Sequence, residues 1–160
     1  MRHVGYGHMI KTAIFDFDGT LADTIPLCLE AFRRAVNDLD GRVLTDREIE
    51  RNFGPDDLGV IRKLFPGKPE WHEHGRELFI HYYQELHAEM APAPFPGTVE
   101  LLHSLRNSGI RLAMVTGKRR ESADISLKFF HLDGFFPVLE TGSPEGGVKT
   151  DRINRALKRL

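Results

Sequence analysis

The segment that most constrains this chain is a short apolar run that ends in two aspartates. Residues 10–17 read Ile-Lys-Thr-Ala-Ile-Phe-Asp-Phe, and Asp18 and Gly19 follow. This run, stopped by a glycine, predicts a buried strand of a parallel sheet. Alternate residues of a strand point the same way, so Asp16 and Asp18 share one side at its carboxyl end, where ligands bind. Two carboxylates that repel each other there favour a functional role over the alternative, an ordinary Asp-Gly turn.

The chain that follows predicts helices without strands up to residue 90, and then an alternation of helices and strands. The stiff segment 91–97, Ala-Pro-Ala-Pro-Phe-Pro-Gly, separates the two patterns and predicts a hinge. The first expected helix has Pro26 in its first turn and stops at Gly41, and the second begins at the capping box Thr45-Asp-Arg-Glu48 and ends near Gly54. Further helices are expected over Pro55–Phe65, Pro69–Met90, Thr98–Asn107 and 119–130, and a last helix follows. Thr98 and Thr150 are the expected caps of the helix at 98–107 and of the last helix. The expected later strands are 110–115 and, more weakly, Phe135–Leu139.

This order predicts an α/β fold in which a Rossmann-like parallel sheet core carries an inserted α-helical cap domain. We expect residues 9–22 and 96–160 to form the discontinuous core and residues 23–95 to form the cap. The N-terminal residues 1–9 lack the apolar stretch of a signal peptide. Their Gly-His-Met ending allows Met9 to be the natural start, so we infer nothing from residues 1–8.

The composition restricts partners and compartment. With 22 basic and 23 acidic residues the net charge is −1, which argues against a dedicated nucleic-acid or membrane-surface binder. No apolar run has the length of a membrane span. Cys28 is the single cysteine and cannot form an internal disulfide, so a reducing, cytoplasmic location is expected.

The segment Asp16-Phe-Asp-Gly-Thr-Leu-Ala-Asp-Thr24 resembles the first motif of the haloacid dehalogenase superfamily in its phosphatase form, Asp-x-Asp-Gly-Thr-Leu-x-Asp-Ser/Thr. The helical insert after it resembles the cap of the phosphoglycolate-phosphatase-like subgroup. The resemblance implies that Asp16 is a nucleophile that forms an aspartyl-phosphate, and that Asp18 is the general acid and base. Members that cleave carbon–halogen bonds lack the second aspartate, so the resemblance favours phosphoryl transfer.

Two later segments resemble the superfamily's phosphate-binding motifs. In Met114-Val-Thr-Gly-Lys118, Thr116 and Gly117 follow a predicted strand, where hydroxyl and N–H groups can donate to phosphate oxygens. Lys149 matches the lysine at the start of a late helix, whose cation would offset the charge of nucleophile and phosphate. The superfamily usually places proline after this lysine, and Thr150 stands there instead.

A carboxylate that attacks a phosphate dianion needs a cation. Each pair of like unit charges 4 Å apart costs about 4 kcal/mol at an effective dielectric of about 20. The resemblance implies Mg²⁺ as the cofactor, held by Asp16 and at the Asp18 position. It also implies that the phosphate site comprises Gly19, Thr116, Gly117 and Lys149.

The predicted function is hydrolysis of a small phosphorylated metabolite such as phosphoglycolate, with sugar phosphates, nucleotides and pyrophosphate as open alternatives. The superfamily's fourth motif, a Gly-Asp with further acidic residues that complete the Mg²⁺ site, has no match before Leu160. The resemblance therefore implies a C-terminally incomplete sheet, weak Mg²⁺ binding and impaired turnover. Residues 10–17 would then expose an apolar edge that favours self-association. The alternative is a fragment, or a non-catalytic binding or assembly module.

Two weaker signals lie in the predicted cap. Residues 70–89 are rich in His and Glu, and we interpret them as a solvated helix face rather than a metal site, which needs converging ligands. The segment Arg51-Asn-Phe-Gly54 lies where related caps place a specificity loop. Arg51 is therefore either a contact for a substrate anion or an ordinary surface arginine.

Overall fold

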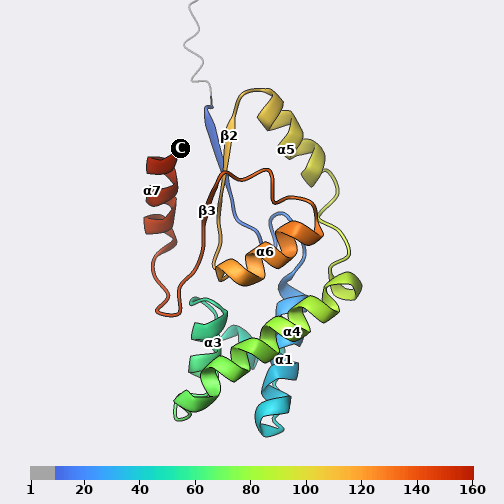
Figure 1. Ribbon diagram of the computed structural model, residues 1–160, viewed down its shortest axis with the longest axis vertical. Coiled ribbons are helices and arrows are strands. Elements are labelled where there is room, and N and C mark those ends of the chain that lie inside the picture. Colours follow the sequence, from blue (N-terminus) through green and yellow to red (C-terminus); the bar gives the residue numbers. More distant parts are fainter. Residues whose placement is uncertain (1–9) are drawn as a thin grey trace, which may run out of the picture.

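The computed structural model describes residues 10–160 and contains a three-stranded parallel sheet (Figure 1). The strands run in the order β1 (Thr12–Phe15), β2 (Arg111–Val115) and β3 (Val138–Glu140), with Ile14 paired to Ala113 and Met114 paired to Leu139. The strand predicted within residues 10–17 is confirmed, and it lies at one edge of the described sheet. The interpretations of residues 1–8 and of Met9 fall outside the described residues.

The helices gather in two regions. The elements between β1 and α5 form the lower part of Figure 1: α1 (Ile25–Asp40), α2 (Asp46–Glu50), α3 (Asp57–Leu64), the 3₁₀ turn η1 (Pro69–Trp71) and α4 (His72–Met90). Beside the sheet lie α5 (Thr98–Asn107), α6 (Arg120–Phe129) and α7 (Lys149–Arg159). We call η1 with α1–α4 the cap, and the sheet with α5–α7 the core.

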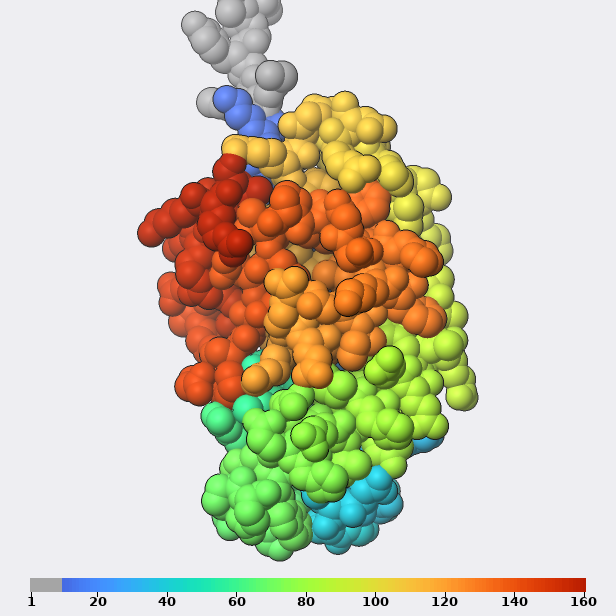
Figure 2. Space-filling view, viewed as in Figure 1, coloured from blue at the N-terminus to red at the C-terminus, as the bar shows by residue number. Residues whose placement is uncertain are grey.

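This arrangement confirms the predicted α/β fold with an inserted helical cap. The predicted boundaries at 9–22, 23–95 and 96–160 stay a prediction. In the space-filling view, the green α4 covers the lower part of the visible face, and the orange and red C-terminal segments cover the part above it (Figure 2). Within residues 10–160, no helix combines the length and the apolarity needed to cross a bilayer.

Both faces of the sheet are covered, as expected for parallel strands with continuous apolar sequence. Phe15 and Met114 belong to the large apolar cluster that includes Leu102 of α5 and Leu127 of α6. On the other face, a smaller cluster joins Ala113, Val115 and Val138 of the sheet to Ala156 of α7. These two clusters fix the carboxyl ends of the strands relative to the start of α7.

In the cap, α1 and α4 pack along their apolar faces, with the rings of Phe32 and Phe79 stacked 4.1 Å apart. Gly41 ends α1 at φ +76°, a left-handed conformation that favours glycine, and its N–H donates to the Asn37 carbonyl. The capping box predicted at Thr45 and Glu48 is confirmed, although α2 ends at Glu50 rather than near Gly54.

Two predicted helix caps are wrong. Thr98 is the first residue of α5 rather than its N-cap, and its hydroxyl donates to the Leu21 carbonyl at 3.2 Å. The N–H of Phe95 donates to the same carbonyl at 2.9 Å, so the chain leaving the cap is bound to the chain entering it. Thr150 is not a cap either, because α7 already begins at Lys149.

An ion-pair cluster fastens α7 to β3. Glu140 accepts hydrogen bonds from Arg155 at 2.9 Å and from Arg159 at 2.8 Å. Burial alone would raise the pKa of Glu140, but the two guanidinium groups outweigh it and lower that pKa below its ordinary value. A depressed carboxyl pKa contributes stability that is present above the unfolded-state pKa and is lost as the pH falls through the folded-state value.

We expect Glu140→Gln to lower the free energy of unfolding by about 1 kcal/mol at neutral pH, since both arginines are half exposed and their charges are screened. The difference from wild type should shrink towards zero below about pH 4, where the wild-type carboxyl also becomes neutral. Urea unfolding of both proteins at neutral and acidic pH measures this. A difference that does not depend on pH would contradict the prediction.

Candidate active site

The carboxyl end of β1 places two aspartates beside two lysines that come from elsewhere in the chain. Asp16 forms an ion pair with Lys149 Nζ at the start of α7 and remains about one-third exposed. Asp18 Oδ1 accepts a hydrogen bond from the Thr24 hydroxyl at 2.6 Å and lies 3.1 Å from Lys118 Nζ. Each carboxylate therefore has its own cationic partner, which reduces the repulsion between them.

The structure brings the residues predicted for the site to the same ends of the strands. Thr116 follows β2 and is fully buried, and its hydroxyl oxygen accepts from the Lys118 N–H at 3.2 Å. Gly117 lines a cavity together with Asp18. Gly19 has φ +71°, and its N–H donates to the Ala22 carbonyl at 2.9 Å, which closes the turn after Asp18. The roles assigned to these residues stay predictions.

A third glycine that the sequence did not single out joins two loops of the site. Gly142 follows β3, and its N–H donates to the Lys118 carbonyl at 2.7 Å. A Cβ atom at this position would lie 2.0 Å from the Gly117 carbonyl oxygen, a distance that no side chain tolerates. Only glycine lets the loop after β3 approach the loop after β2 this closely.

Lys118 is the functional candidate that sequence reasoning missed. It is buried, its ammonium donates to Cys28 Sγ at 3.2 Å, and it lies 4.4 Å from the centre of the Tyr83 ring. Burial alone would lower the pKa of Lys118, but the attraction of Asp18 outweighs it and raises that pKa well above its ordinary value. Lys118 is therefore a charged link between the core and helices α1 and α4. Its position directly after Thr116-Gly117 is the only sequence signal for it.

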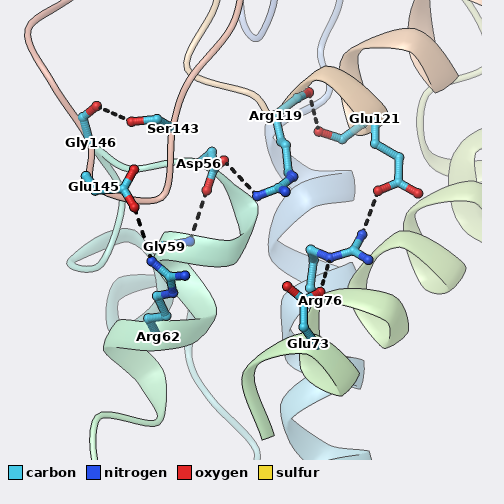
Figure 3. A network of polar contacts seen from close by, with 11 residues as sticks. Asp56, Gly59, Arg62, Glu73, Arg76, Arg119, Glu121, Ser143, Glu145 and Gly146 are labelled. Carbon is cyan, nitrogen blue, oxygen red and sulfur yellow. Dashed lines mark hydrogen bonds and ion pairs between the residues drawn. The ribbon is translucent and has the colours of Figure 1, made fainter. Parts of the chain in front are cut away.

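Polar contacts hold the cap against the core (Figure 3). The Asp56 N–H donates to the Ser143 carbonyl at 3.0 Å, where the start of α3 meets the loop after β3. Gly59 lies so close to this loop that an added Cβ would be 2.4 Å from the Pro144 carbonyl oxygen. Three ion pairs cross the same boundary: Asp56–Arg119 at 3.4 Å, Arg62–Glu145 at 3.4 Å and Arg76–Glu121 at 2.6 Å.

A cavity of about 220 Å³ lies between cap and core. Asp18, Gly117 and Lys118 line its core side, and residues of α1, α3 and the segment before α3 line its cap side. The segment predicted to be a specificity loop does reach this cavity, through Phe53 and Gly54. Arg51, considered as a contact for a substrate anion, is exposed and does not line it.

The histidines and glutamates of α4 do not form a cluster. His74 and Glu77 are 3.7 Å apart and His81 and Glu85 are 3.6 Å apart, each pair more than half exposed. Over residues 10–160, no group of three or more His, Cys, Asp or Glu side chains is arranged to hold a metal ion.

Residues 13–160 match the family described as haloacid dehalogenase-like hydrolase. The chain belongs to this family. Among curated relatives of this chain, pyrophosphatase PpaX of Halalkalibacterium halodurans is 31% identical over 132 residues, which cover 81% of this chain and 59% of the relative. Tyrosine-protein kinase PtkA of Mycobacterium tuberculosis is 30% identical over 158 residues, which cover 96% of this chain and 53% of the kinase. The chain thus spans little more than half the length of these relatives.

Solved structures support the fold of this chain. CbbY from Rhodobacter sphaeroides in complex with phosphate superposes with a TM-score of 0.78 at 23% identity, over 95% of this chain and 73% of CbbY. A predicted phosphoglycolate phosphatase from Haemophilus somnus superposes with a TM-score of 0.67 at 22% identity, over 83% of this chain and 63% of that protein. The names of the relatives agree on phosphoryl chemistry and differ in the molecule that is acted on.

Proposed function

We propose that this chain carries the catalytic residues of a phosphatase that hydrolyses a small phosphorylated metabolite through an aspartyl-phosphate. One observation carries the proposal: the two aspartates of the first motif stand at the carboxyl end of β1, with Asp16 paired to Lys149 and Asp18 paired to Lys118. Relatives named pyrophosphatase and phosphoglycolate phosphatase support a small phosphorylated substrate.

In the proposed reaction, an Asp16 oxygen attacks phosphorus while the bond to the leaving oxygen breaks, and Asp18 gives that oxygen a proton. Asp18 then takes a proton from a water molecule, whose oxygen attacks the phosphorus of the aspartyl-phosphate. Inorganic phosphate leaves and the Asp16 carboxylate is restored. Lys149 and the N–H groups after Thr116 bind the phosphoryl oxygens, and Thr24 and Lys118 orient Asp18.

The donor set fits Mg²⁺, which prefers hard oxygen ligands and is often held by one or two carboxylates, water and a substrate phosphate. Asp16, with its partly exposed carboxylate, and Asp18, through its carbonyl, would hold the ion. When bound, Mg²⁺ would offset the charge between carboxylate and phosphate. Because the described residues offer no third acidic ligand, we propose that binding is weak.

Phosphate release from phenyl phosphate, measured over a Mg²⁺ titration and with EDTA, tests this proposal. We expect release to stop when EDTA removes divalent ions, to return when Mg²⁺ is added back, and to need millimolar rather than micromolar Mg²⁺. Release that is insensitive to EDTA would contradict the metal requirement, and saturation at micromolar Mg²⁺ would contradict weak binding.

We also propose that the edge of β1 pairs with a second copy of the chain, because each residue of β1 is only partly buried and an open strand edge can form backbone hydrogen bonds with another strand. Sedimentation velocity over a wide concentration range is expected to show a fraction of dimer that increases with protein concentration. A monomer at every concentration would contradict self-association, the basis of the alternative role as an assembly module.

A further inference from the structure

The cap side of the cavity next to Asp18 is largely apolar. Ile25 and Phe32 of α1, Phe53, and Val60 of α3 line it. A dry apolar cavity of about 150 Å³ is large enough to bind benzene. The 220 Å³ observed here therefore accommodates an aromatic or alicyclic ring that carries a small substituent.

The charged groups that line this cavity leave no cation for a second anionic group. Lys118 is the one lysine or arginine among the described lining residues, and it is already paired with Asp18. Asp56 is held by Arg119 and by the Gly59 N–H, and Asp57 adds a further carboxyl. An anion that enters this space loses its hydration and meets more carboxyl groups than ammonium groups, which is unfavourable.

The Asp57 carboxyl has one oxygen without a hydrogen-bond partner. The residue is 6% exposed, it lines the cavity, and its Oδ2 has no hydrogen-bond partner. Burial raises the pKa of Asp57 above its ordinary value, against the lowering effects of the Lys118 charge and of a hydrogen bond from Ser122. A ligand hydroxyl suits Asp57 in either protonation state, since a hydroxyl can both donate and accept.

The position of Asp18 connects the cavity to the reaction. A group that protonates the leaving oxygen must lie within hydrogen-bond reach of it, so the rest of the leaving group extends into the space that Asp18 lines. We propose that the leaving group is an uncharged alcohol with an apolar, ring-sized body and a second hydroxyl that hydrogen-bonds to Asp57. This inference rests on the proposed function, and it makes phosphoglycolate and pyrophosphate, whose leaving groups are anionic, poor substrates.

Steady-state hydrolysis of 4-(hydroxymethyl)phenyl phosphate, phenyl phosphate, phosphoglycolate and pyrophosphate tests the inference. We expect kcat/KM for the two aryl esters to exceed that for both anionic competitors by at least about tenfold. Phe53→Ala should raise KM for the aryl esters about tenfold, since it removes an apolar contact. Phe95→Ala is the matched control, because Phe95 is 39% exposed against 38% for Phe53 and lies outside the cavity.

Asp57→Leu tests the second contact by a comparison within the aryl esters, because leucine has a similar shape and cannot form a hydrogen bond through its side chain. If the carboxyl accepts from or donates to the added hydroxyl, this variant should reduce the ratio of kcat/KM for the hydroxymethyl ester to kcat/KM for phenyl phosphate. An unchanged ratio of the two kcat/KM values would remove Asp57 from the proposal. If kcat/KM for phosphoglycolate or pyrophosphate equals or exceeds that for the aryl esters, the proposal of an uncharged leaving group is wrong.

Calorimetric titration of the Asp16→Asn chain with the same four compounds separates this inference from the proposed function. If none of the compounds is hydrolysed in a way that depends on Asp16, the proposed function is wrong. The binding affinities of the Asp16→Asn chain still test the inference about the leaving group in that case. Tighter binding of the aryl esters, weakened by Phe53→Ala, would support it. Tighter or equal binding of phosphoglycolate, or no measurable binding of any of the four, would overturn it.

Discussion

Asp16→Asn is expected to lower kcat for phosphate release by at least about a thousandfold, because an amide of the same shape cannot attack phosphorus and form the aspartyl-phosphate. The fold should persist, since Asp16 is about one-third exposed and its pairing with Lys149 is worth at most about 1 kcal/mol after solvent screening. Initial rates and urea midpoints, measured on the same preparations, separate loss of chemistry from loss of structure.

Asp133→Asn is the matched control for this change, because it is the same substitution at an exposed position away from the site. Its rate and its urea midpoint should equal those of wild type. An Asp16→Asn protein that retains a substantial fraction of the wild-type rate would remove the nucleophile assignment and the proposed mechanism with it.

Lys118→Met is expected to have the largest effect on stability, with a loss of about 2–3 kcal/mol in the free energy of unfolding. The substitution leaves Asp18 without its cation and removes the contacts of the ammonium with Cys28 and with the Tyr83 ring. We also expect kcat to fall, because the orientation of Asp18 is no longer fixed. Urea unfolding, together with phosphate release at a temperature where the variant is folded, measures both effects.

Lys128→Met is the control for Lys118→Met, because Lys128 lies exposed on α6. Surface substitutions of this kind usually change stability by less than about 0.5 kcal/mol. Equal urea midpoints for the two variants would show that the buried position of Lys118 contributes nothing to stability.

The features that sequence alone predicted depend on residues close together in the chain. The strand before Asp16, the capping box at Thr45 and the lysine at the start of α7 each follow from a local pattern. The two wrong caps show the limit of local patterns. The Thr98 hydroxyl has a partner in the Leu21 carbonyl, 77 residues earlier. Helix α7 begins two residues sooner than a cap at Thr150 requires, so Thr150 lies inside the helix.

The parts of the candidate site that sequence could not reveal depend on distant contacts. A lysine after Thr-Gly is usually exposed, and the burial of Lys118 follows only from the packing of α1 and α4 against the loop after β2. The need for glycine at position 142 follows from the approach of another loop. The contribution of Phe53 and Asp57 to the cavity likewise requires the cap to be folded against the core.

The single carbonyl of Leu21, which accepts from both Phe95 and Thr98, has a mechanical consequence. Two independent linkers would let the inserted helices twist as well as swing relative to the sheet. Here the Phe95 N–H and the Thr98 hydroxyl bind the outgoing linker to the incoming one, so a displacement of either linker also displaces the other.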